Sequence, residues 1–151
     1  MSASVSLRAY TGSNAGTESA AQSTVSLCAA DGLTGGDVAP GTRSFERWLR
    51  LRVDVAPVVG VANFWLMNTG DLPDGVSLLF GVADTPATPV NTVSQVATKT
   101  LTSGQKFIFD AATLTDVGDH SRYVVVQEVA AGDAATGAVP SQTLQFGWME
   151  R

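Results

Sequence analysis

Hydrophobic and polar residues alternate strictly along one basic stretch of the chain, within Ser44–Asp54. From position 49 to position 54, leucine or valine takes every odd position and arginine or aspartate takes every even position. Because successive side chains of a strand point to opposite faces, this pattern predicts a strand with one core face and one charged, solvated face. Four of the nine basic residues lie within ten positions here, namely Arg43, Arg47, Arg50 and Arg52. We therefore expect the charged face to be a docking surface.

The same alternation, or a short continuous apolar run, marks seven further segments as strands. Their ranges are Ser4–Tyr10, Ser23–Ala29, Val61–Met67, Val76–Ala83, Gln105–Asp110, Tyr123–Val129 and Thr143–Met149. The segment Asn91–Leu101 is ambiguous, because its apolar spacing approaches that of a short helix while its threonine and valine content favours a strand or irregular chain. Eight or nine short strands without a strong helix predict an all-β, antiparallel β-sandwich of the jelly-roll or immunoglobulin-like kind.

Long loops rich in glycine and proline are expected between these strands. The longest are residues 11–22 and residues 31–42, the second of which contains four glycines and a proline. At 151 residues the chain is expected to be a single domain, with residues 1–3 as a flexible N-terminal arm. The arm and both long loops are candidates for ordering when a partner docks.

Charge and composition narrow the classes of partner. The net charge is −5 and the isoelectric point is near 4.6, which disfavours nucleic acid because phosphate binding needs a dominant basic surface. The single cysteine, Cys28, excludes an intramolecular disulfide and is compatible with a reducing cytoplasm. The N-terminus lacks the features of a signal peptide, and the longest apolar run is too short to cross a bilayer. We therefore expect a soluble protein with no membrane association.

The sequence contains no catalytic or cofactor motif that we recognise. The only histidine, His120, lies in a polar turn, and Cys28 lies in a strand of small residues. One histidine and one cysteine cannot supply a usual zinc site. Three aspartates near His120 fit no EF-hand spacing and more often cap turns: Asp110, Asp116 and Asp119. No phosphate-binding loop is present. We expect a protein that is not an enzyme and has no cofactor and no metal.

Three tryptophans offer an alternative to a purely structural interpretation. Trp48, Trp65 and Trp148 either fill the core or form an aromatic platform for a sugar or a protein partner. Strict alternation places Trp48 on the side of Arg50 and Arg52. A row of arginine, tryptophan and arginine is typical of an interface hot spot, and cation–π stacking on a solvated face is the alternative.

Three segments resemble small virion proteins of tailed bacteriophages. They are Y-T-G-S-N-A-G-T at Tyr10–Thr17, S-F-E-R-W-L-R-L-R-V at Ser44–Val53, and the strand Tyr123–Glu128. The resemblance is strongest to the head decoration (cement) proteins and related accessory structural proteins. It implies a β-sandwich that binds the outer surface of an assembled capsid, with the major capsid protein or another virion protein as partner. It also implies a homo-oligomer, such as a trimer, located on the virion.

Two other functions remain open on the sequence, namely a tail, neck or fibre component and a carbohydrate-binding module that uses Trp48 or Trp65. For the capsid function, the arginines of the Ser44–Asp54 strand and the glycine-rich N-terminal loop are the expected contacts. The candidate interface residues are Arg43, Arg47, Trp48, Arg50, Arg52, Tyr10 and Asn14.

Overall fold

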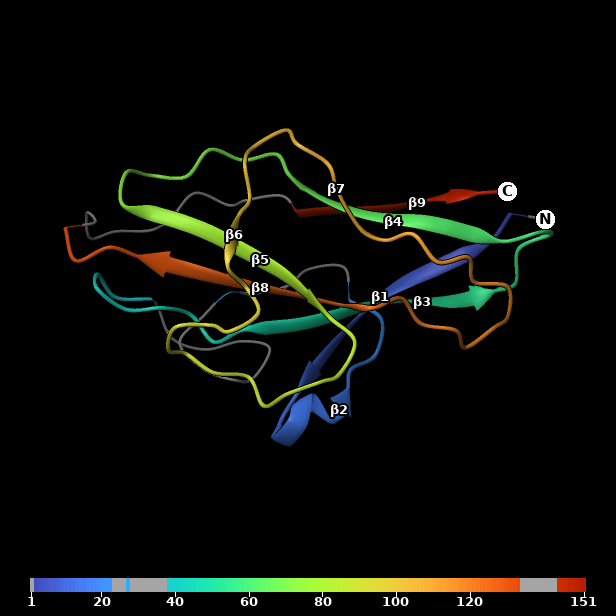
Figure 1. Ribbon diagram of the computed structural model, residues 1–151, viewed down its shortest axis with the longest axis horizontal. Helices are drawn as coiled ribbons and strands as arrows, with labels where there is room; N and C mark the ends of the chain where they lie inside the picture. The colour runs from blue at the N-terminus through green and yellow to red at the C-terminus, as the bar shows by residue number, and fades with distance from the viewer. Residues whose placement is uncertain (1, 23–26, 28–37, 134–143) are drawn as a thin grey trace.

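The computed structural model describes residues 2–22, 27, 38–133 and 144–151. Within these ranges the chain forms nine strands and one short 3-10 helix (Figure 1). The elements are β1 (Ser4–Thr11), η1 (Ser13–Ala15), β2 (Thr17–Glu18), β3 (Arg47–Val55), β4 (Val61–Asn68), β5 (Val76–Ala83), β6 (Lys99–Thr100), β7 (Phe107–Asp110), β8 (Tyr123–Ala130) and β9 (Leu144–Glu150). The chain is thus nearly all β, as the alternation predicts.

The strands form two antiparallel sheets. The large sheet has the order β2-β1-β3-β8-β5-β6, and the small sheet has the order β7-β4-β9. The prediction of an antiparallel β-sandwich is confirmed. In Figure 1 the two ends of the chain lie at the same end of the molecule, where the Ala3 amide donates a 2.9 Å hydrogen bond to the Glu150 carboxylate. Ala3, which the sequence assigns to a flexible arm, also packs against the core.

Three segments differ from the sequence-based expectation or lie outside the residues that can test it. Residues 91–98 form turns and irregular chain, and the two-residue strand β6 follows, so the helical alternative for Asn91–Leu101 is wrong. The strand expected at Ser23–Ala29 lies outside the described residues except for Leu27, which packs against the core. The short strand β2 was not anticipated, because its two residues carry no periodic signal.

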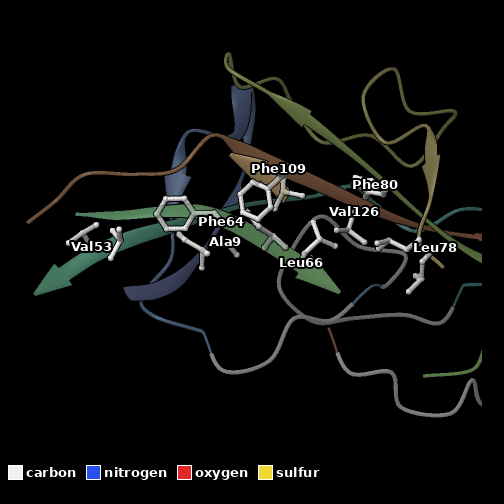
Figure 2. Close-up of a cluster of buried hydrophobic side chains, with 13 residues drawn as sticks. Ala9, Val53, Phe64, Leu66, Leu78, Phe80, Phe109 and Val126 are labelled. Atoms are coloured by element: carbon white, nitrogen blue, oxygen red, sulfur yellow. The ribbon is translucent and has the colours of Figure 1, made fainter. Parts of the chain in front are cut away.

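The main core fills the space between the two sheets (Figure 2). Leu49, Leu51 and Val53 of β3 contribute to it as predicted. From the small sheet, Phe64, Leu66 and Phe109 point toward the large sheet. Phe146 and Trp148 of β9 are partly buried against the same core, so Trp148 has a packing role. Burial of these apolar side chains is the main favourable term for folding.

A second apolar cluster lies on the opposite, outer face of the large sheet. Its buried members are Tyr10, Ala15, Trp48, Ala97, Tyr123 and Val125. Ala15 comes from η1 and Ala97 comes from the irregular segment that follows β5. Two loops therefore cover the middle of a sheet face that the alternation alone assigns to solvent. The continuous apolar run of β8 fits this arrangement, because a strand buried on both faces has no polar side.

Buried polar side chains fix the covering loop of residues 88–97 to the sheet. The Glu46 backbone amide donates to the Val90 carbonyl oxygen, and the Glu46 carboxylate accepts hydrogen bonds from the Val90 amide at 3.1 Å and from the Ser94 hydroxyl. The Ser94 hydroxyl oxygen in turn accepts hydrogen bonds from the Val96 and Ala97 amides. The carboxylate thus satisfies donors of an irregular segment that no strand partner satisfies.

Gln127 of β8 holds the same loop from a second point. Its side-chain amide is completely buried and donates to the carbonyl oxygens of Ser44 and Thr92, each at 3.0 Å. Its carbonyl oxygen accepts a 3.1 Å hydrogen bond from Arg43. Removal of a buried partner in such a network leaves desolvated groups unpaired, so the network strongly favours one loop position.

Gly81 allows the loop to approach the sheet closely. A Cβ atom at this position would lie 1.8 Å from the Val96 carbonyl oxygen, which is backbone and cannot rotate away. We predict that Gly81→Ala lowers the free energy of unfolding by about 3 kcal/mol, because the loop must move away from the sheet to make room for the methyl group. Urea unfolding measures this change. The control is Gly132→Ala, where no atom lies within 4 Å and the expected change is under about 0.5 kcal/mol. Equal losses in the two variants would contradict the close contact.

Candidate functional site

The outer face of β1 and β3 brings together most of the predicted contact residues. The register pairs Tyr10 with Trp48, Arg8 with Arg50, and Ser6 with Arg52. Side chains of paired residues lie on the same face of a sheet. Tyr123 at the start of β8 completes the group on the neighbouring strand.

Aromatic rings form the floor of this site. Tyr10 and Tyr123 meet edge to face with ring centroids 5.4 Å apart, and Trp48 and Tyr123 meet at 5.5 Å in the same manner. Trp48 lies on the predicted side of the strand, but only 1% of it is exposed. The expectation of an exposed Arg–Trp–Arg row is therefore wrong at the tryptophan, because the covering loops enclose its ring. Tyr10 is buried in the same way.

Arg50 lies over this aromatic floor. Its guanidinium carbon is 3.7 Å from the centroid of Tyr123 and 5.5 Å from that of Tyr10. A planar cation over an aromatic face is attracted by the negative π-surface, most strongly where water is partly excluded. Arg50 itself is half-buried. Arg50 thus fits both the hot-spot interpretation and the cation–π interpretation, because it lies over aromatic rings and is still partly exposed.

The neighbouring arginines of this face are bound to a shared carboxylate. Asp54 lies 3.0 Å from Arg52 and 3.5 Å from Arg8. Arg122, outside the site, pairs with Asp84 at 2.6 Å. Arg50 differs, because no carboxylate of the described residues lies within ion-pairing distance of it. In the part of the chain that the structure describes, this cation of the outer face has no counter-ion.

The remaining predicted contact residues lie elsewhere. Arg47 shares a face with Leu49, and only 1% of it is exposed, so its assignment to an exposed basic face is wrong. Arg43 lies beside Val129 at the far end of β8 and donates to Gln127. Asn14 is exposed in η1, with a φ of 55° and its amide bonded to Thr88.

Two members of the site were missed from the sequence. Arg8 follows the same alternation as Ser4 and Ser6, so the pattern of the first strand was sufficient to place it on the polar face. Tyr123 carries no such signal, because it begins a strand in which nearly every residue is buried. Its role depends on the pairing of β3 with β8, which joins segments far apart in the sequence.

The environment of the aromatic floor raises the pKa of Tyr10 to about 12. Burial of the phenol is the largest cause, the charge of Glu18 adds to it, and the charge of Arg50 opposes it. The folded state thus holds the phenolic proton more tightly than the unfolded chain does. Stability from this residue is present below pH 10 and is lost as the pH rises toward 12.

We predict that this effect can be isolated with Tyr10→Phe. Between pH 8 and pH 11 the wild-type protein should lose roughly 1.4 kcal/mol more of its free energy of unfolding than the variant, since phenylalanine has no proton to release. Urea unfolding at the two pH values provides the comparison. The same pH dependence in both proteins would show that Tyr10 does not titrate differently on unfolding.

Other polar groups serve the fold in ways that account for their positions. The carboxylate of Asp110 accepts hydrogen bonds from the Ala112 and Arg122 amides, and that of Asp119 accepts them from the Thr115 and Asp116 amides. These aspartates act as turn caps. No group of three or more metal-ligating side chains occurs in the described ranges, and no helix there is long and apolar enough to span a membrane. Cys28 lies outside those ranges.

The outer face of the small sheet carries a second group of surface residues. The run Phe64–Met67 is divided by strand alternation, because Phe64 and Leu66 are fully buried while Trp65 and Met67 are partly exposed. The Trp65 ring lies on Gly147, and the Lys106 ammonium is 4.3 Å from its centroid. Ile108 and Met149 are 63% and 53% exposed. This face is apolar but has no buried polar group directed to a ligand.

Comparison with known proteins gives no match to a family model, to a curated protein or to a solved structure.

Proposed function

We propose that this protein is a non-enzymatic structural protein of a tailed-phage virion that binds the outer surface of the capsid. The observation that carries the proposal is Arg50, a half-buried cation that lies over two tyrosines and has no carboxylate partner among the described residues, in a chain of net charge −5. Arginine and aromatic residues are enriched at the centres of protein interfaces. The resemblance of three segments to decoration proteins supplies the partner, a major capsid protein.

A capsid-binding role suits a protein whose docking surface is small. A capsid presents the same surface many times, and a homo-oligomer of this chain would engage several copies at once. Such multivalency raises the overall affinity well above that of one contact. A trimer at a symmetry axis is the assembly that the resemblance implies, and we include it in the proposal.

The carbohydrate-binding alternative has less support. It needs an exposed aromatic platform, and Trp48 is enclosed by the covering loops. Trp65 is partly exposed, but the Lys106 ammonium lies 4.3 Å from its ring, where a sugar would stack. No observation favours a tail, neck or fibre location over the capsid surface.

Binding to capsids tests the proposal directly. Particles purified from a phage mutant that lacks this protein are incubated with the purified chain and sedimented. We predict that the wild-type protein co-sediments and that Arg50→Glu loses at least about tenfold in affinity, because a carboxylate replaces the cation at the centre of the contact. Arg122→Glu is the matched control, since Arg122 is exposed and lies outside the site.

Three outcomes separate the parts of this proposal. Absence of wild-type binding to heads, with binding to tails, would move the protein to another part of the virion. Absence of binding to both would remove the virion function. Equal binding by wild type and Arg50→Glu would keep the function and reject this face as the contact.

A further inference from the structure

We propose that Arg50 is a receptor for one carboxylate group, supplied by an acidic side chain of the partner protein. The inference rests on the proposed function in one respect, namely that the outer face of β1 and β3 docks to a protein. It adds the chemical identity of the group that this face recognises.

The geometry of Arg50 leaves one end of the guanidinium available. One face of the group is covered by Tyr123 at 3.7 Å, and Nε is buried without a hydrogen-bond partner. The residue is nevertheless partly exposed, and because Nε is buried the proposal places the ligand at the Nη end. Two Nη groups in one plane match the two oxygens of a carboxylate, which accepts their N–H groups as a pair.

The aromatic floor also prepares the side chain for binding. An arginine in solvent loses rotamer freedom when it binds, and this loss reduces affinity. Arg50 already lies over rings that are themselves buried and packed edge to face. Much of the ordering therefore takes place during folding, before the partner arrives.

The carboxylates around Arg50 are already engaged with other groups. On the outer face, among the described residues, Asp54 lies within ion-pairing distance of Arg8 and Arg52, and Glu18 lies 3.4 Å from His120. The Glu46 carboxylate accepts hydrogen bonds from the covering loop. None of these carboxylates lies within ion-pairing distance of Arg50, so a carboxylate of the partner can take that place.

The charge of the chain favours a protein over a nucleic acid as the partner. Nucleic acid binding neutralises several phosphates at once and needs a continuous basic surface. Here one arginine without a carboxylate partner among the described residues is set in a chain with 14 acidic and nine basic residues, and the neighbouring Arg8 and Arg52 are already paired with Asp54. A single acidic side chain fits this arrangement better than a chain of phosphates.

Nuclear magnetic resonance of the full-length protein tests the inference without a variant. The Nε–H signals of 15N-labelled arginines are followed during titration with a short peptide containing glutamate, its glutamine analogue, and an oligothymidylate. We expect the Arg50 signal to shift saturably with the glutamate peptide, and to shift at least about fivefold less with the glutamine peptide at equal concentration, since only the carboxylate forms a charge-assisted pair.

Two variants identify the receptor. Arg50→Met keeps the length of the side chain over the rings and removes the charge, so it should abolish glutamate-peptide binding while the amide spectrum remains folded. Arg122→Met, which removes an exposed cation elsewhere, should leave the dissociation constant within about twofold. Equal shifts of all arginine signals would show non-specific attraction and reject the proposal. Tighter binding of the oligothymidylate would assign the site to nucleic acid instead.

These results are distinguishable from failure of the proposed function. Glutamate-peptide binding at Arg50 without capsid binding would keep the carboxylate receptor and remove the capsid as partner. Capsid binding that is the same for wild type and Arg50→Met would keep the capsid function and reject Arg50 as its receptor.

Discussion

Burial of the large sheet on both faces is the constraint on which the rest of the structure depends. One face packs on the small sheet, and the other packs under irregular loops. Irregular chain cannot satisfy its own backbone groups in a dry environment, so it needs polar side chains from the sheet. Glu46 and Gln127 supply them, and Gly81 removes the Cβ that would keep the loop away. Polar groups thus allow an apolar face to be covered without a third sheet.

The properties of Arg50 follow from that covering. Trp48 and Tyr123 are buried because the loops enclose them, and the Arg50 guanidinium lies over the Tyr123 ring. Arg50 is only partly buried, so the cluster gives way to the surface at this residue. Arg8 and Arg52 are also partly exposed, and they pair with Asp54 instead. The outer face of β3 therefore changes from buried to partly exposed between Trp48 and Arg50.

Alternation along the chain predicts most of the longer strands and which of their residues share a face. It placed Leu49 in the core and Trp48 beside Arg50, and both placements agree with the structure. Alternation could not reveal what covers each face, because the covering segment at residues 88–97 has no period of its own. That missing information is why Trp48 was expected at the surface. Arg47 was expected there because of its charge, although alternation places it on the side of Leu49. Arg47 shows a further limit, since a charged residue at a core position gives no sign in sequence of how it is accommodated.

Only part of the site could be predicted from the sequence. Arg50 and Arg52 were evident from local spacing, whereas Tyr123 entered through a pairing between segments more than 70 residues apart. No local rule predicts such a pairing, because it is decided by how all strands share one core. The lack of a carboxylate partner for Arg50 among the described residues could not be read from nearby sequence either. It depends on where Asp54 and Glu18 are placed by two different strands.

The position of β8 in the large sheet has a consequence for the order of events during synthesis. β3 and β5 do not pair with each other, and both pair with β8, which begins at Tyr123. Until the ribosome has released that segment, the sheet exists only as separate parts with open edges. Unpaired edges of this kind attract other chains, so the nascent protein passes through a vulnerable stage that ends when its last third emerges. A protein made in many copies at once would be most exposed to this hazard, and rapid arrival of β8 is what relieves it.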